Sequence, residues 1–191
     1  NTYYYTISKA ADADTSWHNG DSPYKLSDAA DLFGFANLVN AGENFEDKTV
    51  ELVADIDLTG YIWTPIGLEN SSAFAGAFDG GNHKVTGMSV HAKGIQCAGL
   101  FGNVRGMVQN VQVEGTVNVT DAAKIYAGGI VGYNTGGTVQ NCLSMVTVYV
   151  EVSGKVLTYV GGVIGYNDGT ADLCWNMGSV QGTGGASVYT S

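Results

Sequence analysis

Residues 128–134 read GGIVGYN, and residues 161–167 repeat the pattern as GGVIGYN. Residues 98–103, AGLFGN, form a third and weaker copy. A second block follows each copy, and the two blocks recur together about every thirty residues; the second blocks lie at residues 106–111, 137–142 and 169–174. A repeat of this length without a helical pattern cannot bury its apolar side alone, so neighbouring repeats are predicted to stack into a solenoid.

Each repeat consists of short strands separated by glycine. Residues 146–153, VTVYVEVS, alternate valine with more polar side chains, which is the period of a half-buried strand. The chain has 28 glycines and 2 prolines, a ratio that favours many tight turns. A propeller blade would need a longer repeat of four antiparallel strands. We therefore expect an all-β protein, a right-handed parallel β-helix that forms one continuous domain, with its coils in residues 49–191.

Residues 1–48 form a different region, predicted to be an N-terminal segment with a capping helix. Ser27 is the expected N-cap of a helix over residues 28–41, and Gly42 its stop signal. The acids expected in its first turn are Asp28 and Asp31, and the apolar face consists of Leu32, Phe35, Leu38 and Val39. Such a helix would cover the apolar cross-section at one end of the solenoid.

Stacked coils place equivalent residues about 4.8 Å apart, and several polar and aromatic residues recur at equivalent positions. The predicted ladders are Asn103 with Asn134 and Asn167, Asn110 with Asn141, Tyr133 with Tyr166, Tyr126 with Tyr159, and Cys142 with Cys174. Asparagine ladders pass side-chain hydrogen bonds between coils. Tyrosine ladders could bind sugar rings if they are exposed, although packing between coils is the simpler account. Cys142 and Cys174 are expected to be buried free thiols.

Charge and cysteine content exclude several classes of partner. The formal net charge is −10, and residues 1–79 hold 13 of the 18 acidic residues but 3 of the 8 basic ones. Such a chain repels phosphate backbones and anionic lipid surfaces, so we expect no nucleic-acid partner. No run of eighteen apolar residues occurs, so no membrane insertion is expected. The three cysteines lack the spacing of a zinc site, and we expect no cofactor.

Some right-handed β-helices cleave polysaccharides, so clustered acidic residues are candidate catalytic residues. Asp168 and Asp172 lie in one turn, but Thr135 and Asn141 occupy the equivalent places one coil earlier. Residues 79–83, DGGNH, are the residue types of a turn. The pairs Asp12 with Asp14 and Asp55 with Asp57 could contribute to a calcium site, but they lack the remaining ligands of an EF-hand loop. We expect solvated carboxylates and no catalytic residue.

Several of these stretches resemble the GLUG-repeat proteins. The resemblance rests on residues 30–40, 54–58, 63–67 and 74–83 as the lead-in, and on residues 98–102, 128–132 and 161–165 as the repeats themselves. It covers roughly residues 25–182. The family implies a pectin-lyase-like right-handed β-helix in secreted or cell-surface bacterial proteins, including adhesin-like proteins and non-catalytic regions of IgA peptidases. Two features depart from the family pattern. Residues 1–24 lie outside it, and Leu173 stands at the position that Asn110 and Asn141 occupy in the other repeats.

The sequence thus favours a non-catalytic, extracellular structural or adhesive module. Its expected partners are a host or cell-surface glycan or protein, or further copies or repeats that dock end to end. The alternative is a carbohydrate-active β-helix enzyme, either a polysaccharide lyase or a hydrolase. Residues 187–191 are predicted to begin another strand, which would present an uncovered edge to the next coil or to another copy.

Overall fold

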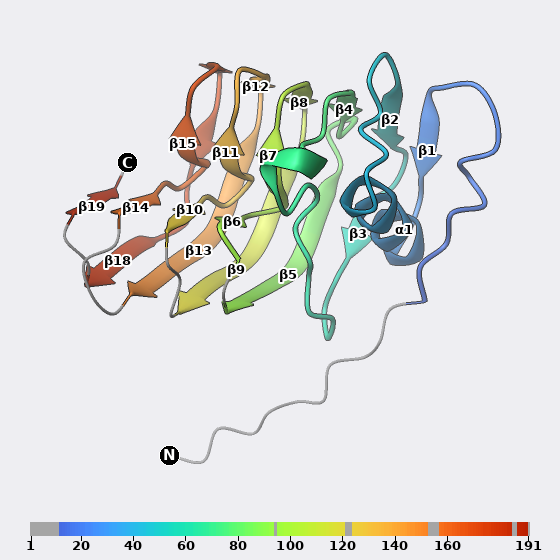
Figure 1. The fold of residues 1–191 in the computed structure, drawn as a ribbon. Coiled ribbons are helices and arrows are strands. Elements are labelled where there is room, and N and C mark those ends of the chain that lie inside the picture. The colour runs from blue at the N-terminus through green and yellow to red at the C-terminus, as the bar shows by residue number, and fades with distance from the viewer. Residues whose placement is uncertain (1–11, 94, 121–123, 153–156, 185–186, 191) are drawn as a thin grey trace.

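The protein is seen in a computed structural model that describes residues 12–93, 95–120, 124–152, 157–184 and 187–190. The chain winds through four sheets, and each coil adds strands beside those of the preceding coil (Figure 1). Sheet A contains β1 (Tyr24–Leu26), β2 (Thr49–Leu52), β4 (Ala77–Asp79), β8 (Met107–Gln109), β12 (Thr138–Gln140) and β16 (Thr170–Asp172). Sheet B contains β3 (Ile56–Asp57), β5 (Lys84–Lys93), β9 (Gln112–Thr120), β13 (Leu143–Val152) and β17 (Trp175–Asn176), with β18 (Val180–Gly184) also paired to β13.

Two smaller sheets complete each coil. Sheet C contains β7 (Phe101–Val104), β11 (Val131–Asn134) and β15 (Ile164–Asn167). Sheet D contains β6 (Cys97–Ala98), β10 (Ile125–Ala127), β14 (Leu157–Val160) and β19 (Ser187–Thr190). The second coil, which begins at β2, also carries the short 3-10 helix η1 (Asn70–Ser72). The third coil runs from β4 to β7, the fourth from β8 to β11, the fifth from β12 to β15, and the sixth from β16 to β19.

Parallel pairing in register explains how the coils stack. In sheet A, Val139 lies between Val108 of the preceding coil and Ala171 of the following one. In β13 the valines at 146, 148 and 150 are fully buried, while the intervening side chains face outward. The predicted all-β parallel β-helix with a helix near its N-terminus is therefore confirmed. Among the described residues, no helix is long and apolar enough to cross a membrane.

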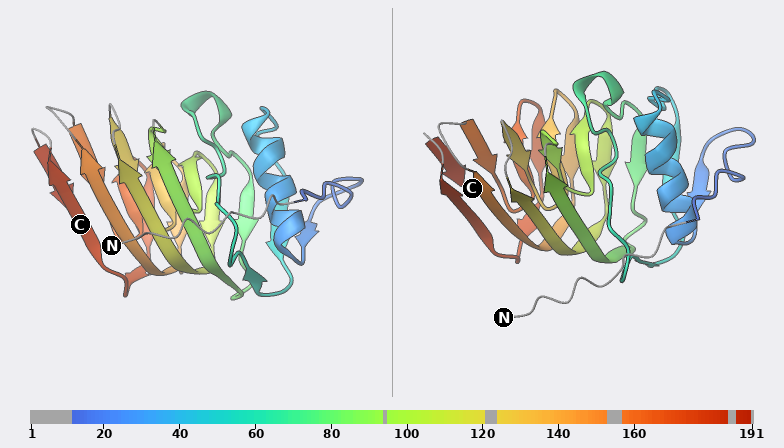
Figure 2. Two further views of the ribbon diagram at one scale, coloured as in Figure 1. Left: turned by 90° about the horizontal axis from the view of Figure 1, so that it is seen from below. Right: turned by 60° about the horizontal axis from the view of Figure 1, so that its bottom comes forward.

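The single α-helix of the described chain, α1 (Ala29–Asn40), lies at the N-terminal end of the stack (Figure 2). The prediction that Ser27 is its N-cap is wrong. Asp28 has the extended backbone of a cap and accepts the N–H of Asp31 on Oδ1 at 3.0 Å. Ser27 instead donates its backbone N–H and its hydroxyl to Asp31 Oδ2, at 2.8 and 2.9 Å. Gly42 ends the helix as expected, with a φ of 108° and its N–H directed to Val39 O.

The helix packs on the interior of the coils through aromatic side chains. Leu32, Phe35 and Val39 are buried, whereas Leu38 of the predicted face is half-buried. The ring of Phe35 is in contact with four other phenylalanine rings at centroid distances of 5.1 to 6.4 Å; these belong to Phe45, Phe74, Phe78 and Phe101. The helix therefore covers the apolar end of the core, as a capping helix should.

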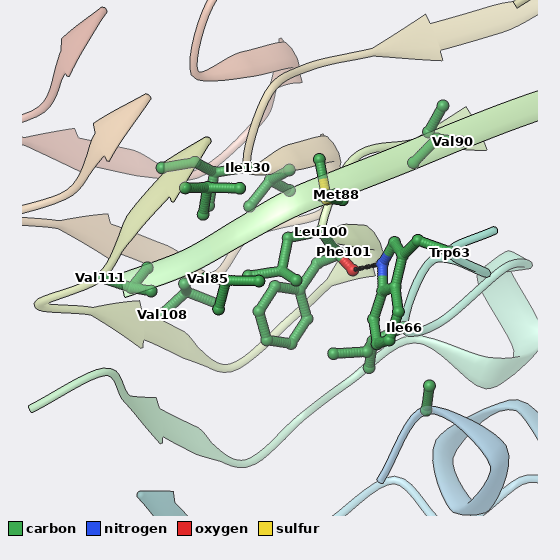
Figure 3. Close-up of a cluster of buried hydrophobic side chains, with 14 of the residues drawn as sticks. Trp63, Ile66, Val85, Met88, Val90, Leu100, Phe101, Val108, Val111 and Ile130 are labelled. Atoms are coloured by element: carbon green, nitrogen blue, oxygen red, sulfur yellow. Dashed lines mark hydrogen bonds between the residues drawn. The ribbon is translucent and has the colours of Figure 1, made fainter. Parts of the chain in front are cut away.

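The core is continuous along the solenoid and changes in composition along its length. Near α1 it contains large rings such as Trp63, whose indole N–H donates to Leu100 O at 3.1 Å (Figure 3). Further along, the buried positions of sheet B are mostly valine. A buried indole needs such a partner, since an unpaired donor is unfavourable away from water.

Glycine allows sheets C and D to approach each other closely. A Cβ atom on Gly132 would lie 2.8 Å from both Ala98 N and Tyr126 O, and one on Gly165 would lie 2.6 Å from Ala127 N. Side chains larger than hydrogen do not fit at these distances from backbone atoms. The glycines of the GGxxGY pattern thus let β11 approach β6 and β10, and let β15 approach β10. The tyrosines that precede and follow these glycines therefore lie close together.

Candidate functional site

Four tyrosines, of which one is buried and three are half-buried, meet where sheets C and D adjoin. This tyrosine cluster consists of Tyr126, Tyr133, Tyr159 and Tyr166. Tyr126 stacks on Tyr159 of the next coil at 5.4 Å and an interplanar angle of 16°, and Tyr133 meets Tyr166 edge-on at 5.2 Å. Tyr126 and Tyr133 also lie 4.8 Å apart across the two sheets. The predicted tyrosine ladders therefore join into one cluster.

A groove of about 800 Å³ lies beside this cluster. It is lined by Leu68, Glu69, Asn70, Ser71, Ile95, Gln96, Cys97, Asn103, Lys124, Tyr126 and Tyr133. In the third coil, Cys97 pairs with Tyr126 and Asn103 pairs with Tyr133, so smaller side chains occupy the tyrosine positions there. On the other side, residues 67–73 leave the coil between the bridges of Ile66 to Phe101 and Phe74 to Val104, and they include η1. This excursion forms the second wall of the groove.

This register corrects the predicted ladder of Asn103, Asn134 and Asn167. Asn134 pairs with Asn167, and its amide nitrogen donates to Asn167 Oδ1 at 2.7 Å. Asn103, however, lies beside Tyr133, and Val104 lies beside Asn134. The third coil has no tyrosine between Gly102 and Asn103, so its asparagine falls one position early. This missing tyrosine is visible in the sequence, and the groove could have been predicted from it.

Polar groups converge on the floor and rim of the groove. Asn103 is only 1% exposed, accepts the Thr135 hydroxyl at 2.5 Å, and directs its amide nitrogen to Asn70 Oδ1 at 3.3 Å. The ammonium of Lys124 lies 4.9 Å from the centroid of Tyr126. The adjacent Tyr126 hydroxyl raises the pKa of Lys124, which is therefore charged at neutral pH. Burial raises the pKa of the Cys97 thiol to about 12, so this sulfur in the groove lining is neutral.

Two ladders of amide side chains begin at Asp79. One runs along sheet A, and the other runs along the corner that follows sheet A. Gln109 Nε2 donates to Asp79 Oδ2 at 2.7 Å, and Gln140 Nε2 donates to Gln109 Oε1 at 2.7 Å. Asn110 Nδ2 donates to Asp79 Oδ1 at 2.9 Å, and Asn141 Nδ2 donates to Asn110 Oδ1 at 2.8 Å. A carboxylate suits the end of an amide ladder because it accepts bonds without having to donate one. The ladder of Asn110 with Asn141 was predicted from the sequence, but Asp79, which accepts from Asn110 and Gln109, was not.

The corner itself requires a left-handed backbone in successive coils. Asn82, Asn110 and Asn141 have φ values of 62°, 56° and 50°. Leu173 continues this column with a φ of 49°, and its side chain is 60% exposed. Asparagine tolerates this region, whereas most other side chains meet the following carbonyl oxygen. The departure of Leu173 from the asparagine pattern therefore places a strained apolar residue on the surface.

The thiols of Cys142 and Cys174 follow the same corner on adjacent coils, and both are free. Cys142 is fully buried, while Cys174 is partly buried against the core. The neighbouring Cys174 sulfur and burial raise the pKa of the Cys142 thiol. We therefore treat Cys142 as a packing residue.

Of the acidic residues singled out in the sequence, Asp14 and Asp57 accept hydrogen bonds within their own turns, and Asp55 accepts one from the next coil. Asp55 Oδ1 accepts the backbone N–H of Lys84 at 3.0 Å and lies 3.1 Å from His83 Nδ1. Asp57 accepts the N–H and hydroxyl of Thr59, and Asp14 accepts the N–H and hydroxyl of Ser16. In the part of the chain that the structure describes, no group of three or more His, Cys, Asp or Glu side chains is placed to hold a metal ion.

Comparison with known proteins identifies a known motif in this arrangement. Residues 125–148, which run from β10 into β13, match the model of the GLUG motif. This chain carries the GLUG motif. Its match spans Tyr126, Tyr133, Asn134 and Asn141, so the motif contributes to the tyrosine cluster and to both kinds of ladder.

One similar sequence and one solved structure with a similar fold extend the comparison beyond the GLUG motif. Halomucin from Haloquadratum walsbyi is 30% identical over 141 residues, which cover 67% of this chain and 2% of halomucin. A crystal structure from Bacteroides ovatus, described as a candidate immunoglobulin A1 protease, has a TM-score of 0.55 and 18% identity, and the match covers 92% of this chain and 61% of that one. The resemblance to GLUG-repeat proteins is confirmed. This chain spans a small part of halomucin and less than two thirds of the Bacteroides chain.

Replacing Leu173 by asparagine should stabilise the GLUG solenoid. Asparagine relieves the left-handed strain and can donate to Asn141 Oδ1, so we expect a gain of about 1 kcal/mol in the free energy of unfolding. Leu157→Asn is the matched control because Leu157 is also exposed but lies in a strand, where asparagine is unfavourable. Urea denaturation measures the free energy of unfolding of both variants. An unchanged or lower stability of Leu173→Asn would contradict the strain argument.

Asp79 should make stability depend on acid pH. Burial opposes ionisation, but the Gly81 N–H and the amides of Asn110 and Gln109 outweigh it and hold the pKa of Asp79 below its ordinary value of 3.8. The folded protein therefore has this stabilisation above about pH 4 and loses it as the pH falls through the lower, folded pKa. Asp79→Asn should lose about 1–2 kcal/mol at pH 7, and its deficit should shrink in acid. The exposed Asp168→Asn is the control, and a pH-independent deficit would show that the charge is unimportant.

Proposed function

We propose that this chain is a non-catalytic, extracellular repeat module of a surface or secreted protein, and that the side of its solenoid binds a partner. The observation that carries the proposal is the tyrosine cluster beside the groove. The rings stack on one another, and two of them, the buried Tyr126 and the half-buried Tyr133, line a hollow whose walls are both polar and apolar. Pockets of about 300–1,000 Å³ with a few convergent polar groups are typical ligand sites.

The non-catalytic part of the proposal is supported by the hydrogen bonds that the carboxylates make. Both oxygens of Asp79 accept hydrogen bonds from ladder amides, and Oδ1 of Asp55 and Oδ1 of Asp57 each accept a backbone N–H. A hydrolase of the β-helix type would use carboxylates that face a substrate groove at a defined separation. In the groove described above, the carboxylate is that of Glu69, on the rim.

The proposed location is tested on intact cells that produce the full-length protein. Mild protease treatment should release fragments of this module, because a surface module is accessible from outside. An intracellular protein from the same cells serves as the control for lysis and should stay intact. Resistance of the module on intact cells, together with cleavage after lysis, would place it inside the cell and contradict the proposal.

A second candidate, self-assembly, is favoured by an apolar patch on the later coils. Trp175 and Met177 are 55% and 71% exposed, and Met145 of the preceding coil is 39% exposed. Adjoining exposed apolar side chains mark surfaces that dock partners.

Self-assembly through this patch would appear in light scattering. We expect the average mass of the purified chain to rise with concentration, and the double variant Trp175→Ser with Met177→Ser to remain monomeric. Val53→Ser, which also removes an exposed apolar residue, is the control and should behave like the wild type. A monomeric wild type across the concentration range would eliminate this candidate.

A further inference from the structure

The shape of the groove follows from two tyrosines that the third coil lacks. The fourth and fifth coils each supply one tyrosine from sheet D and one from sheet C. In the third coil the same two positions hold Cys97 and Asn103. The groove therefore occupies the space that a third pair of rings would fill, and the excursion that contains η1 walls off its far side.

One aromatic face borders this space. Tyr159, which belongs to the fifth coil, stacks on one face of Tyr126 with nearly parallel rings. Because β10 lies between β14 and β6, the other face of Tyr126 is on the side of the third coil, where the groove lies. Tyr126 is 9% exposed in all, so a ligand would meet this ring at the wall of the groove beside the Lys124 ammonium. Lys124 lies at this ring and is itself exposed, so its ammonium can move toward a ligand without leaving a buried charge behind.

Hydrogen-bonding groups surround the aromatic face. The amide of Asn103 forms the floor and is held in place by Thr135. Asn70, Glu69 and Ser71 lie on the η1 side, and Gln96 lies on the sheet D side. These groups offer both donors and acceptors, with one carboxylate and one ammonium among them.

We infer that this groove binds an oligosaccharide of pyranose units, with one sugar ring in the place of the missing tyrosines. A pyranose has an apolar C–H face, which packs on an aromatic ring, and a rim of hydroxyl groups, which need both donors and acceptors. The groove combines these two features. The inference rests on the proposed binding role and names the chemical class of its ligand.

A saccharide fits the groove better than a peptide strand. Peptides that add to a sheet derive affinity from a row of main-chain hydrogen bonds to an exposed strand edge. The sheet D strand that borders the groove, β6, has only two residues, and the remaining walls are side chains and the η1 excursion. The groove thus offers few main-chain partners but several amides.

The experiment measures the binding of four probes to the purified chain by saturation-transfer NMR and by calorimetry. The probes are cellohexaose, mannohexaose, xylohexaose and hexagalacturonate, which differ in stereochemistry and charge. The key variant is Cys97→Tyr, which gives the third coil the residue that the next two coils already have at this position. It should fold as a continuation of the cluster and fill the groove, so that binding is lost.

A second variant tests the groove independently, in case Cys97→Tyr does not fold. Tyr133→Ala removes one aromatic wall and should weaken binding about tenfold, the upper range for one ring contact. Tyr149→Ala is the matched control because Tyr149 is a half-buried tyrosine of the same solenoid that does not line the groove. Its affinity should equal that of the wild type.

The inference holds if at least one probe binds, loses binding with Cys97→Tyr and keeps it with Tyr149→Ala. Binding of none of the four probes would overturn it, as would binding that survives Cys97→Tyr in a folded protein. Capture of a protein partner by the same groove, without any saccharide, would also overturn it. In each of these cases protease accessibility on intact cells is unaffected, so failure of the sugar ligand is distinguishable from failure of the proposed surface location.

Discussion

In-register parallel pairing between coils is the constraint on which the rest of this structure depends. Strands of neighbouring coils repeat about every 4.8 Å, so each side chain lies above its equivalent in the preceding coil. A residue type that suits one coil therefore recurs in the next, and valine forms the core, asparagine the corner, and tyrosine the outer cluster. Amide side chains can satisfy one another along such columns, as Gln140 and Gln109 do.

The same constraint makes each interruption of a column consequential. Asp79 ends two amide ladders at their N-terminal side, where an acceptor without a donor is suitable. Phe35 of α1 covers the core at the end where the coils begin. Cys97 and Asn103 interrupt the tyrosine columns, and the space left by their smaller side chains becomes a groove. The candidate site of this protein is thus an exception within an otherwise regular repeat.

Glycine links the regular repeat to the candidate site. Without a Cβ atom, Gly132 and Gly165 let the strands of sheets C and D lie almost in backbone contact. That approach brings Tyr126 and Tyr133, which are seven residues apart, to a ring separation of 4.8 Å. The GLUG motif matched by residues 125–148 therefore encodes a close contact between two sheets, and the tyrosine cluster is its outer consequence.

The sequence by itself determined the fold class, the position of the helix, and the ladders of Asn110 with Asn141 and Tyr126 with Tyr159, because a repeat in register is visible as periodicity. It did not determine that Asp28 rather than Ser27 caps the helix, since both are acceptable cap residues and the backbone angles select one. It misplaced Asn103 because the blocks were matched on their glycine and asparagine residues, although the missing tyrosine shifts Asn103 by one position. Only the tertiary structure decided the groove, which arises where the η1 excursion of one coil faces the missing tyrosines of the next.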